Sequence, residues 1–309
     1  MAERGKRAAA SGRRSFGPVR VLLILIFAAV FVFSGYMFLS TYLEGQKEQG
    51  AFDQLTQLKT EILTGAGSEE IDMSLYFPDG DYSTASAEEI AAAEERAAAE
   101  ALAREQQAKL DWYSQMKEEY PDLIGWVSVP GMLIDYPVMY TPEDPDYYLH
   151  RSYDGSYARS GTPFLGEGGD ENSDCTIVYG HNMKNDTMFG TLEEYKEESF
   201  GRANPVVYFD SLEEIRAYTV FAAVECRVLT ETENDLRYYQ YAGPLDERSF
   251  DELNDWLIDR SIYDLGAAPQ FGDQIVILST CSYHTEDGRF IVAAFRERPE
   301  ETEETIQAE

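Results

Sequence analysis

The most constraining feature of this 309-residue chain is an apolar, β-branched run, Ile275–Leu278, that leads through Ser-Thr into Cys281. A short run of this kind predicts a buried strand that carries a thiol at its open end. Asp287-Gly288 is a turn signal, and residues 289–295 have the composition of a returning strand. Because an antiparallel pair brings the last residue of one strand near the first of the next, Cys281 and Arg289 are expected to be neighbours.

This hairpin indicates candidate catalytic residues. A guanidinium beside a thiol can lower the thiol pKa or hold a developing oxyanion. A second buried run, residues 175–179, leads through Gly180 to His181, which fits a positioned acid or base. We therefore predict Cys281 as nucleophile, His181 as acid/base and Arg289 as oxyanion group. The competing interpretations are a buried structural cysteine, a satisfied histidine and a salt-bridged arginine.

The remaining cysteines and histidines have weaker signals. Cys226 is predicted to be a structural cysteine on a core-facing strand position, and Cys175 lacks an adjacent base. His284 sits in a polar turn with nothing to fix its ring, and His150 has no assigned role. No cofactor or metal is expected, because the three histidines lack zinc spacing and the acidic loop 167–174 lacks EF-hand spacing.

Composition limits the functional class. A formal net charge of -32 argues against nucleic-acid binding, which needs a cationic surface. Three cysteines do not make a disulfide framework. A hydrophobic fraction of 44% with 13% aromatic residues suits a globular, β-rich domain.

The N-terminal region predicts a membrane anchor. Residues 1–20 form a basic tail, and residues 21–39 contain no charged side chain. As a helix this stretch would span roughly 29 Å, close to the ~30 Å hydrocarbon core. The basic flank predicts a cytoplasmic N-terminus and an extracellular remainder. A cleaved signal peptide is the alternative, but its apolar region is usually ~7–15 residues and residues 37–42 offer no Ala-x-Ala site.

Residues 40–110 are predicted to be an extracellular linker and stalk. Residues 41–85 are polar, and glycines and Pro78 lead us to expect irregular structure. Ser86 and Glu89 form a capping-box pattern that opens an Ala/Glu-rich helix to about Leu110. This helix lacks a large apolar stripe, so a solvated spacer is favoured over a partner-binding helix. An apolar face beyond it predicts docking onto the domain: Leu110, Trp112, Tyr113, Met116 and Tyr120.

The rest of the chain reads as short strands with few helices. Strands are expected at residues 126–129, 133–139, 163–165, 176–179, 205–209 and 216–229, ahead of the Cys281 hairpin. In residues 216–229, the alternating residues from Tyr218 to Val228 are predicted to share the core face. Residues 246–260 predict an amphipathic helix, and residues 299–309 an acidic disordered tail. The fold class is therefore mainly β, a closed or nearly closed barrel with peripheral helices.

Several motifs together resemble the sortases, and within them class B. These are Tyr-Gly-His-Asn-Met at 179–183, Leu-Ser-Thr-Cys at 278–281 and the downstream Arg289, with further similarity at 135–138, 147–149 and 188–195. The resemblance covers roughly residues 112–298, so the catalytic domain is assigned to 111–298. It implies an eight-stranded barrel with a helix between the sixth and seventh strands, where residues 246–260 lie.

The resemblance also implies a function. It implies a cysteine transpeptidase that cleaves a secreted protein's C-terminal sorting motif after Thr and joins the protein to an amine on cell-wall peptidoglycan or a pilin. The enzyme would be anchored in a Gram-positive cell membrane by its N-terminal helix. Substrate contacts are expected from Ser279, Thr280, Leu149, Asn182 and Tyr283.

Two other classes of function stay open. One is a cysteine protease, although papain-like and caspase-like patterns do not match. The other is a non-catalytic anchored surface domain with Cys281 in its core. Ser282 follows the nucleophile where some class B members have an acidic residue, and Pro145 stands where Asn is frequent. The preference among Asn-Pro-x-Thr, Ser-Pro-x-Thr and Leu-Pro-x-Thr therefore stays open.

Overall fold

The computed structural model describes residues 18–67, 72–77, 83 and 85–298. The chain forms two compact units, residues 1–47 and 48–309. Most of the predicted basic tail and the whole of the predicted acidic tail, residues 299–309, lie outside the described residues.

One long helix, α1 (Pro18–Gly67), contains the uncharged N-terminal stretch. Its segment Leu25–Ala66 includes a window with a mean hydropathy of 1.8, and none of that window is buried. By length and composition, α1 can cross a membrane. The N-terminal half of this helix is therefore a candidate membrane anchor.

The expectation of irregular structure after residue 41 is wrong as far as Gly67, because α1 continues without a break to that residue. Each glycine costs a helix only about 1 kcal/mol. Burial of Phe52 and Leu55 offsets that cost, and Lys59 forms a largely buried ion pair with Asp135. The compact unit that contains the barrel begins at Glu48.

The Ala/Glu-rich helix is α2 (Ala87–Glu119), and it follows the short helix η1 (Met73–Tyr76). The predicted capping box is present, with reciprocal bonds between Ser86 and Glu89. The predicted docking face is confirmed, since Trp112, Tyr113 and Met116 are buried in one cluster with β-strand residues. The solvated-spacer interpretation needs one correction: two alanines of the N-terminal half, Ala93 and Ala97, are buried.

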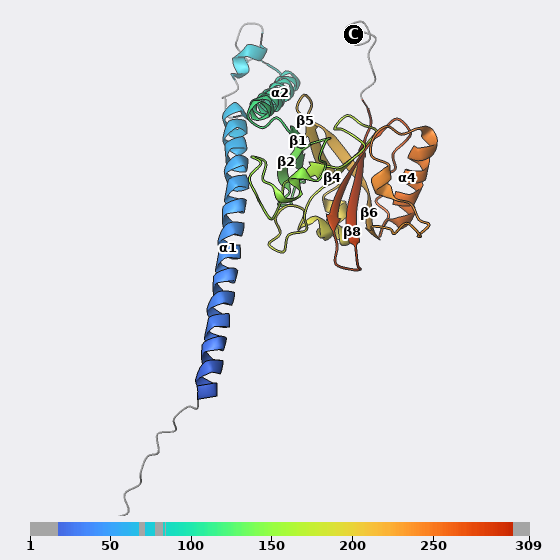
Figure 1. Ribbon diagram of the computed structural model, residues 1–309. Helices are drawn as coiled ribbons and strands as arrows, with labels where there is room; N and C mark the ends of the chain where they lie inside the picture. Colours follow the sequence, from blue (N-terminus) through green and yellow to red (C-terminus); the bar gives the residue numbers. More distant parts are fainter. Residues whose placement is uncertain (1–17, 68–71, 78–82, 84, 299–309) are drawn as a thin grey trace, which may run out of the picture. The chain divides into compact units, whose positions relative to one another are not determined.

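Eight strands close into a barrel in the order β1-β2-β3-β4-β7-β8-β6-β5, which confirms the predicted fold class (Figure 1). The strands are β1 (Leu123–Ser128), β2 (Asp135–Met139), β3 (Phe164–Leu165), β4 (Cys175–Tyr179), β5 (Val206–Ser211), β6 (Ala217–Arg227), β7 (Gln274–Cys281) and β8 (Gly288–Arg296). Short helices interrupt the connections: η2 (Tyr147–His150), η3 (Leu192–Lys196), α3 (Glu198–Ala203) and η4 (Tyr238–Gln240).

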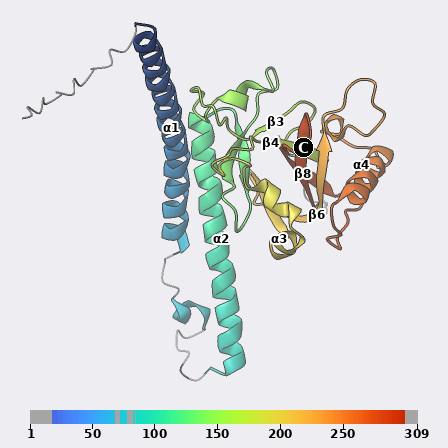
Figure 2. The same ribbon diagram turned by 90° about the horizontal axis from the view of Figure 1, so that it is seen from below.

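Besides the cluster under α2, the barrel strands contribute to two further apolar clusters. The interior cluster contains residues from strands all around the barrel, among them Val127, Val178 and Val292. The outer cluster lies between the far face of β4, β7, β8 and β6 and the helix α4 (Glu247–Arg260). In Figures 1 and 2, α4 lies against the β6 and β8 side of the barrel. The prediction of an amphipathic helix at 246–260 is confirmed, with Asp246 as its N-cap.

The prediction that alternating residues of β6 share one face is wrong. A bulge interrupts the β6–β8 register between Val220 and Ala222. An extra residue in one strand reverses the side on which all later side chains lie. Tyr218 and Val220 therefore face the interior cluster, whereas Ala222 and Val224 belong to the outer cluster.

Candidate active site

Two parallel strands deliver the histidine and the cysteine to one end of the barrel. In the β4–β7 pair, Tyr179 is the register partner of Ser279. The pairing is extended beyond this point by a bond from the Gly180 amide to the Ser279 carbonyl (3.1 Å) and one from Thr280 Oγ1 to the Gly180 carbonyl (2.7 Å). His181 and Cys281 are the next residues on their strands, so they emerge at the same level.

The expected proximity of Cys281 and Arg289 is confirmed, because the two residues are register partners in the β7–β8 hairpin. The Arg289 guanidinium donates to the backbone oxygen of Gly288 at 3.0 Å. Within the described part of the chain it makes no ion pair with a carboxylate, so the salt-bridge alternative finds no support. Its charge is available to a negative group that forms beside the thiol.

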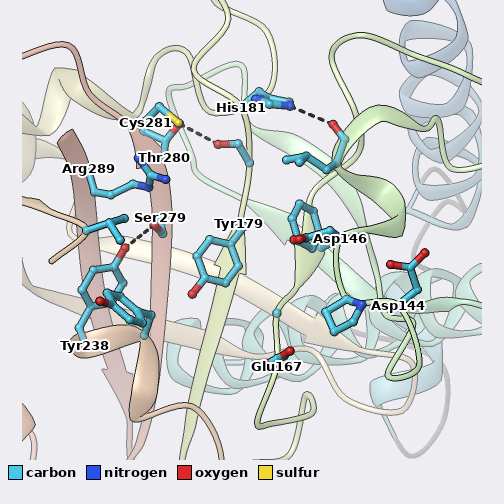
Figure 3. A pocket seen from close by; sticks show the side chains of 17 residues that line it. Asp144, Asp146, Glu167, Tyr179, His181, Tyr238, Ser279, Thr280, Cys281 and Arg289 are labelled. Carbon is cyan, nitrogen blue, oxygen red and sulfur yellow. Dashed lines mark hydrogen bonds between the residues drawn. The ribbon is translucent and has the colours of Figure 1, made fainter. Parts of the chain in front are cut away.

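These residues line one cleft of about 600 Å³. Figure 3 shows Cys281 and His181 at one end of it and Arg289 next to Cys281. Of the predicted substrate contacts, three line the cleft: Ser279, Thr280 and Leu149. The structure does not bring the other two into it. The Asn182 side chain is bonded to the Cys281 carbonyl (2.9 Å), and Tyr283 is 73% exposed outside the cleft.

A single hydrogen bond sets the tautomer of His181. Its Nε2 lies 2.9 Å from the Leu149 carbonyl, which can only accept. Nε2 therefore carries the proton, and Nδ1 of the neutral ring is free to take one up. Burial lowers the pKa of His181 below its ordinary value, and the bond to Leu149 offsets only part of that effect. The stacked ring of His150, 5.3 Å away between centroids, also disfavours the charged form.

Ser279 contacts a residue that sequence reasoning did not identify. Its hydroxyl lies 2.9 Å from the Tyr238 hydroxyl, and both groups are buried (Figure 3). Ser279 follows Ile275 and Ile277 of the outer cluster in the strand alternation, so its side chain lies on the outer face of β7 and not in the barrel interior. Tyr238 stacks on Trp256 of α4. No residue pattern in the loop that contains Tyr238 predicts its hydrogen bond to Ser279.

Acidic side chains form the wall of the cleft opposite Arg289 (Figure 3). Asp144 and Asp146 flank Pro145 in the β2–β3 connection, and Glu167 lies beyond β3. The sequence had marked residues 167–174 only as a surface loop. The cleft is thus cationic at the thiol end and anionic on the facing side.

The other two cysteines differ from Cys281 in their surroundings: Cys175 is buried in the outer cluster, and Cys226 is half-buried against it. Burial raises the pKa of both Cys175 and Cys226 to about 12. They contribute to the outer cluster as small apolar side chains, as predicted for Cys226. The expectation that nothing fixes the His284 ring is wrong, because its Nδ1 lies 3.0 Å from the Ser282 hydroxyl.

Comparison with known proteins gives a consistent assignment. A sortase-domain family model matches residues 127–297. Sortase B of Listeria monocytogenes is 32% identical over 178 residues, which cover 55% of this chain and 68% of that protein. Sortase B of Staphylococcus aureus is 24% identical over 291 residues, 91% of this chain and 96% of the relative.

Solved structures agree with this result. The crystal structure of sortase B from B. anthracis, in complex with AAEK1, has a TM-score of 0.51 and 27% identity, covering 60% of this chain and 84% of that one. The family model spans more than half of this chain and includes the three residues at the cleft end. The chain therefore belongs to the sortase family of cysteine transpeptidases, and within that family to class B.

Proposed function

We propose that this protein cleaves a C-terminal sorting motif after Thr through a thioacyl-enzyme and joins the carried protein to an amine acceptor. The observation that supports it most is the meeting of Cys281, His181 and Arg289 at one end of a single cleft. Among the residues that the structure describes, Arg289 makes no ion pair with a carboxylate. A thiol, a base with a free nitrogen and a cation are the groups that acyl transfer needs.

In the first half-reaction, the Cys281 thiol transfers its proton to His181 Nδ1, and the sulfur attacks the threonine carbonyl carbon. The carbonyl oxygen gains negative charge, which the Arg289 guanidinium stabilises. Collapse of this intermediate breaks the C–N bond, and His181 returns the proton to the departing amine. A thioester between Cys281 and the threonine remains.

In the second half-reaction, an acceptor amine attacks the thioester carbonyl and His181 takes its proton. The C–S bond breaks, a new amide bond forms, and Cys281 is regenerated as the thiol. The acceptor would be an amine of cell-wall peptidoglycan or of a pilin. Ser279, Thr280 and Leu149 would contact the sorting motif, because they line the same cleft as the thiol.

The proposed location is the outer face of a Gram-positive cell membrane. The apolar N-terminal half of α1 would cross the bilayer, with the basic residues before it in the cytoplasm and the catalytic domain outside. Both the sorting substrate and the acceptor would then be reached at the same surface. Protease added to intact cells should digest the catalytic domain only if this orientation is correct.

The test uses the full chain in detergent micelles, as wild type and as Cys281→Ala. Each is mixed with quenched-fluorescent peptides containing the three candidate motifs, with and without an amine acceptor, and intact mass is recorded. Wild type should gain a thioacyl adduct that converts to ligated product, and the variant should gain neither. An adduct that only hydrolyses would indicate a protease, and the absence of any adduct would contradict the proposal.

A further inference from the structure

One carboxylate contacts the segments that follow both the histidine and the cysteine. Glu193, on η3, accepts a hydrogen bond from the hydroxyl of Ser282, and the nearby side chain of Asn182 favours its charged form. Asn182 in turn donates from Nδ2 to the backbone oxygen of Cys281 at 2.9 Å. Glu193 is therefore bonded to the residue after Cys281 and lies beside the residue after His181.

Only one assignment of donor and acceptor fits the hydrogen bonds that the Ser282 hydroxyl makes with Glu193 and His284. Ser282 is only 3% exposed, so water does not replace its protein partners. A carboxylate only accepts, so the hydroxyl proton lies toward Glu193. The Nδ1 of His284, 3.0 Å from Ser282 Oγ, must then be the donor. A directed chain of bonds thus runs from His284 through Ser282 to Glu193.

Glu193 itself is held on a fixed support. Its neighbours Leu192 and Tyr195 are buried in the interior cluster. Lys196 pairs with Glu193 at 2.9 Å and with Glu225 of β6 at 2.8 Å. Burial acts to raise the pKa of Glu193, but hydrogen bonds from Ser282 and Lys196 outweigh it and leave the pKa below its ordinary value. The carboxylate is therefore charged and oriented at neutral pH.

Regular strand pairing in β4–β7 ends at Tyr179 and Ser279. Beyond that level, one backbone bond from Gly180 to Ser279 and several side-chain bonds decide how far apart the two reacting groups lie. We infer that Glu193 is a positioning residue, which sets the separation of His181 and Cys281 through its bond to Ser282 and its charge beside Asn182. This inference rests on the proposed transpeptidase function. Misplacement of reacting groups by about 1 Å can cost ~100-fold in rate.

The experiment compares Glu193→Ala and Glu193→Gln with Glu194→Ala in the full chain in detergent micelles. Glu194 is the matched control, because it lies on the same short helix and is exposed. The readouts are kcat and KM on the motif peptide that wild type acylates fastest, together with the thermal unfolding midpoint. We expect Glu193→Ala to lower kcat roughly 10- to 100-fold with KM changed less than about 2-fold.

Glu193→Gln keeps an acceptor oxygen for Ser282, so it should recover most of the lost kcat. Ser282→Ala tests the same contact from its other side, and adding it to Glu193→Ala should cause little further loss. Equal kcat in Glu193→Ala and Glu194→Ala, or a loss in Glu193→Ala that only matches its unfolded fraction, would overturn the inference. A wild type that acylates no peptide would overturn the proposed function and this inference with it.

Discussion

Arg289 lies between two cysteines on adjacent strands, paired in register with Cys281 of β7 on one side and with Cys226 of β6 on the other. Directly opposed residues in an antiparallel sheet point to the same face, so the three side chains form a row. Cys281 is at the cleft, whereas Cys226 is packed against the outer cluster. Burial dominates at Cys226 and raises its pKa to about 12, although the Arg289 charge acts in the opposite direction.

The raised pKa values of Cys175 and Cys226 predict that alkylation of the folded protein is selective for Cys281. At pH 8, a thiol with a pKa of about 12 is thiolate in only ~1 molecule in 10⁴. Iodoacetamide should therefore label the folded chain once, at Cys281, and should not label folded Cys281→Ala. In denaturant, wild type should take up three labels. Failure of Cys281 to react in the folded protein would favour the non-catalytic surface domain.

Replacement of Arg289 should affect the chemical step rather than binding. Arg289→Ala is expected to lower kcat about 10²- to 10³-fold with little change in KM, because the guanidinium acts on charge that develops in the transition state. Arg289→Lys should recover only part of the loss, since an ammonium lacks the planar fork. Arg248→Ala, at a side chain 86% exposed on α4, is the control for loss of positive charge and should match wild type in steady-state kinetics.

The buried pair of hydroxyls predicts a non-additive effect on stability. Ser279→Ala leaves the Tyr238 hydroxyl buried without its partner, which should cost about 1–3 kcal/mol in the free energy of unfolding. Adding Tyr238→Phe to Ser279→Ala removes the unpaired tyrosine hydroxyl. The double variant should therefore regain part of the lost free energy of unfolding. Urea unfolding of both single variants and the double variant measures the coupling. Additive losses would show that the bond does not link the two residues.

The N-terminal boundary can be tested by truncation. A chain that begins at Ser86 lacks Phe52 and Leu55, whose burial contributes roughly 3–6 kcal/mol, and leaves Asp135 without Lys59. Its unfolding midpoint should be about 10 °C below that of a chain that begins at Glu48. All cleft residues follow Asp144, so turnover per folded molecule should be equal in the two chains. Equal midpoints would contradict the packing of α1 on the catalytic domain.

His181 should make the protein less stable in acid. Burial lowers its folded pKa below the unfolded value of about 6.5, so the unfolded chain binds the proton more strongly. The contribution to stability is complete above the unfolded pKa of about 6.5 and is lost as pH falls from there through the lower folded pKa. Urea unfolding at pH 7.5 and pH 5.5 should therefore show a larger decrease for wild type than for His181→Asn. An equal decrease in the two proteins would exclude this effect.

The barrel and the residues at the thiol end of its cleft follow closely from sequence patterns. β-Branched runs of five to eight residues show where β4 and β7 lie, and the turn at Asp287-Gly288 sets the pairing of Cys281 with Arg289. The motif at residues 179–183 and the family resemblance predict that His181 is the acid/base partner of Cys281. These signals are local because strand alternation and turn chemistry are properties of adjacent residues.

Other features depend on contacts between distant segments. The glycines of residues 41–67 predicted a break, and only burial of Phe52 and Leu55 against the barrel shows why the helix persists. The bulge between Val220 and Ala222 reverses the face on which the later side chains of β6 lie. The residue pattern of the strand does not predict this bulge. Local propensity is too weak to decide such cases against the energy of packing.

The sequence by itself determined the strands, the hairpin and the identity of the three residues at the end of the cleft. Only the tertiary structure decided that Tyr238 bonds Ser279, and that Glu193 bonds Ser282 in the segment after Cys281. Ser279 and Tyr238 are 41 positions apart, and Glu193 and Ser282 are 89 positions apart. Hydrogen bonds over such separations exist only once the barrel has closed and burial has excluded water as the competing partner.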